Sequence, residues 1–234
     1  MALWVGTSGY NYPEWKGSFY PEKFPTAKML PYYAERFSTV EINYTYYRMP
    51  NEKILAGWSR ETPDHFKLTL KAPKRITHDA RLRDCADLVG YFLDTAATLG
   101  QKLGAILFQL PPFLRKDLAL LDAFLATLPV GLCATFEFRH SSWLEDAVYD
   151  RLRARNLSLC VADNKEHSTP FAITADYGYF RLRDEGYKPA DIVRWAHTIR
   201  DKTASCKDVY VYFKHEETGT APEFARQFVE AFGA

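Results

Sequence analysis

Several kinds of segment are missing from this sequence, and each absence excludes a class of protein. The 234 residues contain no run of about 18 apolar residues, so no membrane-spanning helix is expected. The first six residues have neither a basic flank nor a long apolar segment, so we expect no secretory signal peptide. Lys and Arg number 30 and Asp and Glu number 29. The resulting net charge of +1 gives no general argument for binding nucleic acid or a membrane surface.

Paired cysteines are missing as well. The four cysteines are Cys85, Cys133, Cys160 and Cys206. They form no Cys-x-x-Cys pair, and two of them lie in apolar, strand-like runs. Free, buried thiols in a reducing compartment explain this pattern, so the sequence predicts a cytoplasmic protein. We find no internal repeat, low-complexity tract or linker, which favours a single domain over residues 1–234.

Strand-like and helix-like segments alternate along the whole chain. The eight expected strands are residues 3–6, 39–42, 66–71, 105–109, 133–138, 157–162, 179–182 and 209–213. The seven expected helices are residues 27–37, 52–60, 86–99, 118–128, 144–155, 190–203 and 222–232. Residues 164–176 show no clear helical pattern, so we expect a loop there.

This alternation predicts an α/β fold of the TIM type, a barrel of about eight parallel strands with helices outside. The rival is an open doubly wound sheet, which requires a glycine-rich phosphate-binding turn after the first strand. Residues 6–9 hold only two glycines, and a long loop rich in aromatic residues follows them rather than a helix. The barrel is therefore favoured.

Alternation along the strands predicts which side chains face the barrel interior. Successive side chains point to opposite faces, and the set that faces the helices should be bulky and apolar. Phe66, Leu68 and Leu70 fit the helix side of the third strand, which turns Lys71 inward, and the same rule turns Arg181 inward. The last inward residue of most strands is polar or charged: Glu41 with Asn43, Lys71, Gln109, Glu137 with Arg139, Asp163, Arg181 and Lys214.

These side chains are expected to meet at the C-terminal mouth of the barrel, where the active sites of such barrels lie. A salt-bridge network that only closes the barrel is the structural alternative, because buried charges need partners. For the whole set at one mouth we favour a ligand site. Two loop histidines, His78 and His140, add candidates. Four aromatic residues are expected to wall the pocket and stack on a planar ring or sugar: Tyr10, Tyr12, Trp15 and Tyr46.

Several motifs resemble a known family over essentially the full chain. They are Trp4-Val-Gly-Thr-Ser-Gly-Tyr10, Trp15-Lys-Gly-x-Phe19-Tyr-Pro21, Val40-Glu-Ile-Asn43 with Thr45-Tyr-Tyr-Arg48, Lys71-Ala-Pro73, Ile76-Thr-His78, Phe108-Gln-Leu-Pro-Pro112 and Phe136-Glu-Phe-Arg-His-Ser-Ser-Trp143. Together they resemble the domain-of-unknown-function 72 family (DUF72, also called YecE-like). The resemblance implies a TIM-type barrel and no settled activity. The chain has Arg183-Asp184 where the family often has His-Gly, and Lys214-His215 where it often has two Asn.

The favoured hypothesis is a metal-free, hydrolase-like enzyme that acts on an anionic or sugar-like substrate. Glu41 and Glu137 would be its acid and base, with pKa values split by different cationic neighbours, and Asp163 and His78 are further catalytic candidates. The cationic side chains of the mouth would hold the negative charge of the substrate. On this hypothesis, Glu137→Gln should abolish activity or binding while leaving the protein folded.

Two alternatives stay open. A metal-dependent hydrolase or isomerase of phosphodiesters or sugars would use Glu41, Glu137, Asp163 and His78 as ligands, although the nearby cations oppose a divalent ion. A non-catalytic protein would bind an anion or a nucleic acid, which the net charge does not indicate. The expected partner is a small molecule or an anion, with no membrane partner. The sequence leaves open the substrate, any cofactor, the separation of Glu41 and Glu137 and the oligomeric state.

Overall fold

Eight β-rich runs form strands in the computed structural model, which describes residues 1–163, 168–214 and 219–233. The strands are β1 (Ala2–Thr7), β2 (Thr39–Ile42), β3 (Lys67–Lys71), β4 (Leu103–Gln109), β5 (Ala134–Glu137), β6 (Ser158–Asp163), β7 (Tyr177–Leu182) and β8 (Asp208–Phe213). They pair in parallel in the order β1-β8-β7-β6-β5-β4-β3-β2. All eight expected strands are therefore confirmed.

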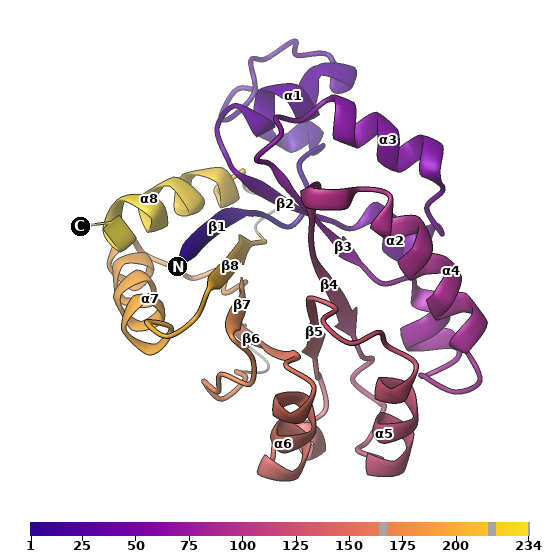
Figure 1. Ribbon diagram of the computed structural model, residues 1–234. Coiled ribbons are helices and arrows are strands. Elements are labelled where there is room, and N and C mark those ends of the chain that lie inside the picture. Colours follow the sequence, from indigo (N-terminus) through magenta and orange to yellow (C-terminus); the bar gives the residue numbers. More distant parts are fainter. Residues whose placement is uncertain (164–167, 215–218, 234) are drawn as a thin grey trace.

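Helices surround the strands, as Figure 1 shows. They are α1 (Met29–Ala34), α2 (Tyr44–Tyr47), α3 (Glu52–Arg60), α4 (Ala86–Ala97), α5 (Leu118–Ala126), α6 (Asp146–Ala154), α7 (Pro189–Lys202) and α8 (Ala221–Gly233). The seven expected helices are present, most with bounds that differ by one to a few residues. Helix α2 was not expected, because four residues are too few to show a helical period. In the β6–β7 connection, residues 168–176 contain no helix, as expected.

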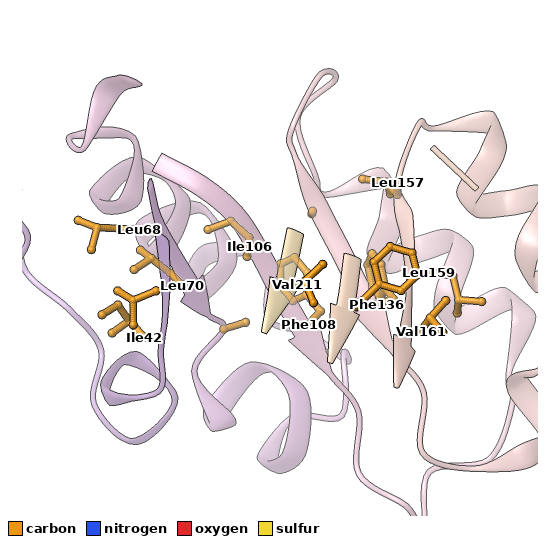
Figure 2. Close-up of a cluster of buried hydrophobic side chains, with 14 of the residues drawn as sticks. Ile42, Leu68, Leu70, Ile106, Phe108, Phe136, Leu157, Leu159, Val161 and Val211 are labelled. Atoms are coloured by element: carbon orange, nitrogen blue, oxygen red, sulfur yellow. The ribbon is translucent and has the colours of Figure 1, made fainter. Parts of the chain in front are cut away.

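The hydrophobic core has two layers. The larger layer lies between the strands and the helices, and Figure 2 shows side chains of β2, β3, β4, β5, β6 and β8 that belong to it. The smaller layer fills the barrel and contains Ala105, Leu107, Cys160, Ala162, Tyr177, Tyr179, Tyr210 and Tyr212. Residues of the two layers alternate along the strands, and this alternation is what predicts which side chains face the barrel interior and which face the helices.

The barrel closes between β1 and β2 without a continuous ladder. Ser8 and Glu41 form an isolated parallel bridge, and the Gly9 amide donates to the Glu41 carbonyl at 2.8 Å. The two strands approach very closely at Gly6, where a Cβ atom would lie 2.0 Å from the Thr39 carbonyl oxygen. Glycine is required there because the backbones touch. The result is a nearly closed α/β barrel of the expected TIM type.

The cysteines and the helix lengths complete the description of the fold. The four cysteines are free thiols, and three of them are buried. Within the described segments, no helix is long and apolar enough to cross a membrane.

Candidate functional site

A buried arginine joins three strands at the C-terminal end of the barrel. Arg181 alternates on β7 with Phe180 and Leu182, which face the helices, so its side chain points inward. Its Nη2 lies 2.7 Å from Glu41 Oε1 on β2, and its Nη1 lies 2.5 Å from Glu137 Oε2 on β5. All three side chains are at most 2% exposed. Charges this deep persist only when paired, so each of the three depends on the others.

Four donors surround the carboxylate of Glu137. Besides Arg181, Gln109 Nε2 donates at 2.9 Å and Arg139 Nε at 3.0 Å, and Arg183 Nη1 lies at 3.4 Å. Burial alone would raise the pKa of Glu137. The charges of Arg181, Arg139 and Arg183 outweigh burial and hold that pKa well below its ordinary value. Because the donors occupy both oxygens, this carboxylate accepts hydrogen bonds and stays ionised at neutral pH.

The carboxylate of Glu41 is engaged in the same way. Ser8 Oγ donates to it at 2.5 Å and Tyr179 Oη at 2.6 Å, and Arg181 is its ion-pair partner. Burial alone would raise the pKa of Glu41, but the Arg181 charge and these hydrogen bonds lower it below its ordinary value. This corrects the expectation that the pKa values of Glu41 and Glu137 are split between an acid and a base. The pKa values of Glu41 and Glu137 are both lowered, because the two carboxylates share one arginine.

A polar cavity of about 330 Å³ lies at the C-terminal ends of the strands. Seven predicted residues line it: Tyr12, Asn43, Lys71, Gln109, Arg139, Arg181 and Lys214. Four other lining residues complete it: Asn11, Tyr44, Tyr47 and Arg183. Five of these eleven residues are cationic and none is acidic. The cavity is the size of a small-molecule site, and its charge favours an anion.

Lys71 is a lining residue whose pKa is strongly lowered. Its side chain ends β3, the residue is 9% exposed, and its Nζ lies 4.1 Å from the centroid of the Tyr46 ring. Burial, and then the charge of Arg181, lower the pKa of Lys71 to about 7. Figure 1 shows β3 between β2 and β4, in agreement with the strand order.

His78 lies next to this lysine but does not line the cavity. Its ring packs edge-on against Tyr46 with centroids 5.2 Å apart, and its Nδ1 lies 2.9 Å from Thr77 Oγ1. Burial, and then the charge of Lys71, lower the pKa of His78 below its ordinary value. His78 and Tyr46 therefore support Lys71 from behind the cavity wall.

The backbone that carries His78 has an uncommon geometry. Residues Arg75–Asp79 form a π-helix, and Arg81, Leu82 and Asp84 follow with φ values of 53°, 68° and 45°. Such segments cost free energy in residues other than glycine and often occur at functional sites. This supports the C-terminal side of β3 as part of the site.

Asp163 does not join the charged cluster, which corrects its placement at the mouth. Leu159 and Val161 of β6 belong to the layer that faces the helices, and Asp163 has the same parity. Its Oδ2 accepts a hydrogen bond from Tyr187 Oη at 2.6 Å, in the loop after β7. The absence of a clear alternation in this strand is the reason that the sequence placed it wrongly.

Tyr10 and His140 also lie outside the cavity lining. The Tyr10 ring packs against Tyr33 in the core of the first loop, and burial raises its pKa to about 12. His140 accepts the Ser142 amide at 3.1 Å through Nδ1 and so caps the short helix Ser141–Trp143. Both residues have local structural roles here.

Four lining residues were missed as pocket residues, and Asn11 is one of them. Tyr44 and Tyr47 lie three residues apart on α2 and are 39% and 71% exposed. Two exposed aromatic residues directly after a strand are the signal that could have identified them. Arg183 follows Arg181 by two residues and so shares its inward direction. His215, which pairs with Lys214 in the departure from the family pattern, lies outside the described residues.

A second, mostly apolar cavity of about 850 Å³ lies between the first loop, the end of α1 and α8. Phe19, Phe37 and Val229 are among its lining residues. Its charged residue Arg226 pairs with Glu223 on the exposed face of α8. This cavity lies away from the buried charge cluster, so the smaller polar cavity is the candidate site.

The residues expected to bind a metal ion do not converge. Glu41 and Glu137 are held by Arg181, whereas Asp163 and His78 contact Tyr187 and Thr77 instead. Within residues 1–163, 168–214 and 219–233, no three His, Cys, Asp or Glu side chains are grouped to hold a metal ion.

The family model and the curated relatives agree on one family. The sequence model of the family described as "Protein of unknown function DUF72" matches residues 4–234. The UPF0759 protein YecE of Escherichia coli K12 is 30% identical over 169 residues, which cover 70% of this chain. That match spans only 60% of the relative's own length. The UPF0759 protein YunF of Bacillus subtilis is 24% identical and covers 97% of this chain and 94% of its own.

A solved structure extends the comparison to the fold. The crystal structure of a DUF72 family protein from Thermotoga maritima superposes with a TM-score of 0.88 and 25% identity. The match covers 100% of both chains.

Proposed function

Because this chain belongs to the DUF72 family, which is described only as being of unknown function, we propose its function from the geometry of its own cavity. The protein binds a small anionic molecule at the C-terminal mouth of its barrel and acts on it as an enzyme.

The observation that carries this proposal is the charge of the cavity lining. Among the residues that the structure describes, five cationic side chains line the cavity and no acidic one does. The two nearby carboxylates lie beneath, where Arg181 and other donors already occupy their oxygens. A bound anion would form charge-assisted hydrogen bonds with these cationic side chains.

The roles of the carboxylates change accordingly. Glu41 and Glu137 orient Arg181, and Glu137 also contacts Arg139 and Arg183, so the guanidinium groups are fixed before a ligand arrives. Such pre-organisation increases affinity because fewer side chains must be ordered on binding. Acid–base catalysis by the two carboxylates, the version first expected, is disfavoured by their lowered pKa values.

The other lining residues indicate the rest of the ligand. Tyr44 and Tyr47 offer aromatic faces, while Asn11 and Asn43 offer amides that donate and accept hydrogen bonds. This combination suits a planar ring or a sugar that carries a phosphate or carboxylate. A single strand of nucleic acid would use the same contacts. We favour the small molecule, because the cavity volume is about 330 Å³ and the net charge of the chain is +1.

Thermal unfolding with inorganic pyrophosphate tests the proposal. A ligand that binds only the folded state raises the melting temperature. At constant ionic strength, set with sodium chloride, pyrophosphate should raise the melting temperature of the wild-type protein. Lys214→Gln should reduce the apparent affinity at least about tenfold, because it removes one charged contact.

Lys207→Gln is the matched control. Lys207 and Lys214 lie just before and just after β8, at its two ends, and the two substitutions remove the same charge. Lys207 is exposed and pairs with Asp176 away from the mouth, so its substitution should leave the pyrophosphate effect unchanged. An equal loss in both variants, or no effect of pyrophosphate on the wild-type protein, would rule out an anion site at the mouth.

A further inference from the structure

One lysine of the cavity has no acidic partner. Lys71 lines the cavity beside Arg139 and Arg181, and its Nζ lies over the ring face of Tyr46. In the part of the chain that the structure describes, no carboxylate lies within ion-pair distance of this amine. Glu137, the nearby acid, is held by three arginines instead.

The surroundings of Lys71 keep much of its amine uncharged. Burial lowers the pKa of Lys71 to about 7, and the charges of Arg181 and Arg139 lower it as well, while Glu137 and Glu41 oppose them. A free lysine with a pKa of about 10.4 has roughly one neutral amine in 2,500 at neutral pH. About half of the Lys71 amines are neutral under the same conditions. Only the neutral amine is a nucleophile.

We propose that Lys71 is a nucleophile that captures the carbonyl carbon of a small, anionic aldehyde or ketone as an imine. The proposal rests on the anion-binding function above, and it names the substrate class of that same cavity. The lone pair of Nζ attacks the carbonyl carbon, and a proton moves from nitrogen to oxygen to give a carbinolamine. The hydroxyl group then takes a proton from solvent and leaves as water while the nitrogen lone pair forms the C=N bond, which gives a protonated imine, so the step needs no oxidant or reductant.

The cavity separates the two tasks that this substrate requires. Arg183 and Lys214 line the same cavity and are placed to hold the anionic group, as a guanidinium does with two parallel hydrogen bonds. The Tyr46 ring lies against the amine, with Nζ 4.1 Å from its centroid, and its ring face favours a cationic imine. Burial, and then the positive neighbours, lower the pKa of the free amine, as a cationic neighbour does for other reactive lysines.

Trapping with borohydride tests this inference directly. Pyridoxal 5′-phosphate, an aldehyde with a phosphate group, is added at neutral pH in a stoichiometric amount, and borohydride then reduces any imine to a stable secondary amine. Peptide mapping by mass spectrometry locates the label. Lys71 should be labelled at least about tenfold more than the exposed Lys207, which serves as the internal reference. Glyoxylate, a smaller aldehyde acid, is the second probe in case the first is too large.

One variant and one competitor separate the outcomes. Lys71→Arg keeps the positive charge but cannot form an imine, so it should take up no label at residue 71. Pyrophosphate should protect Lys71 in the wild-type protein. If pyrophosphate binds but neither aldehyde labels Lys71 above Lys207, this inference is wrong and the anion-binding function stands. If pyrophosphate does not bind, the proposed function itself fails.

Discussion

Replacing Arg181 with methionine should be among the most damaging single changes in this barrel. The substitution keeps most of the side-chain volume but removes the charge that joins Glu41 to Glu137. Glu137 keeps Arg139 and Arg183, whereas Glu41 keeps only its neutral hydrogen bonds. Breaking a buried ion pair from one side costs about 3 to 5 kcal/mol. We therefore expect Arg181→Met to lower the free energy of unfolding by about that amount at neutral pH.

The pH dependence of the Arg181→Met defect distinguishes electrostatics from packing. In the wild-type protein the pKa of Glu41 is lowered, so its contribution to stability is present above the unfolded pKa and lost as pH falls. Without Arg181, burial raises the pKa of Glu41 instead, so the variant regains stability as pH falls and Glu41 becomes protonated. The difference between the two proteins should therefore shrink between pH of about 7 and about 5.

Urea unfolding of three variants measures this defect. Arg181→Met with Glu41→Gln should regain at least half of the lost stability at neutral pH, because no unpaired charge then remains at position 41. Arg153→Met is the control, since Arg153 pairs with Asp150 on the surface, and it should cost less than about 1 kcal/mol. A loss below about 1 kcal/mol for Arg181→Met, or one independent of pH, would refute the buried-pair reasoning.

Three further predictions follow from the same contacts. Glu137→Gln should destabilise the protein by about 3 to 5 kcal/mol in urea unfolding, contrary to the expectation that it stays folded; an unchanged urea midpoint would show that the network is not structural. The pKa of Lys71 is about 7 in the folded state and about 10.4 in the unfolded state, so the free energy of unfolding of the wild-type protein should rise by about 4 to 5 kcal/mol between those pH values. Lys71→Met should remove this rise, as measured by urea unfolding at several pH values. Parallel curves for wild type and variant would contradict that value. Gly6→Ala should lower the free energy of unfolding by at least about 3 kcal/mol in thermal unfolding, because the added carbon would meet the Thr39 carbonyl. Gly57→Ala in α3 is the control, since its added carbon meets no atom within 4 Å, and it should stabilise the protein by about 0.5 to 1 kcal/mol. Equal effects of the two alanines would exclude a close contact at Gly6.

Much of the fold was predictable because the barrel repeats one simple rule. Eight apolar runs with alternating parity fix eight strands, and the same parity turns Arg181 and Lys71 inward. The convergence of Glu41 and Glu137 on one mouth follows from parallel topology, since all the strands end on the same side.

The partners of these side chains could not be predicted in the same way. The alternation of side chains shows that Arg181 faces inward. Only the register of β2, β5 and β7 brings one of its terminal nitrogens within 2.7 Å of Glu41 and the other within 2.5 Å of Glu137. The pKa values of those carboxylates depend on these distances, which is why the sequence suggested one acid and one base. Asp163 was misplaced because an apolar strand gives no alternation to read. Helix α2 was missed because a single turn has no period.

A crystal soaked with tungstate tests the central claim most directly, because this phosphate analogue scatters strongly and its anomalous signal gives its position without prior phases. If the mouth is an anion site, the strongest tungsten peak lies in the cavity, within contact of Arg183, Lys214 or Lys71. Peaks confined to exposed lysines and arginines elsewhere, with the cavity holding only water, would contradict the anion-binding function and the role of Lys71 that depends on it.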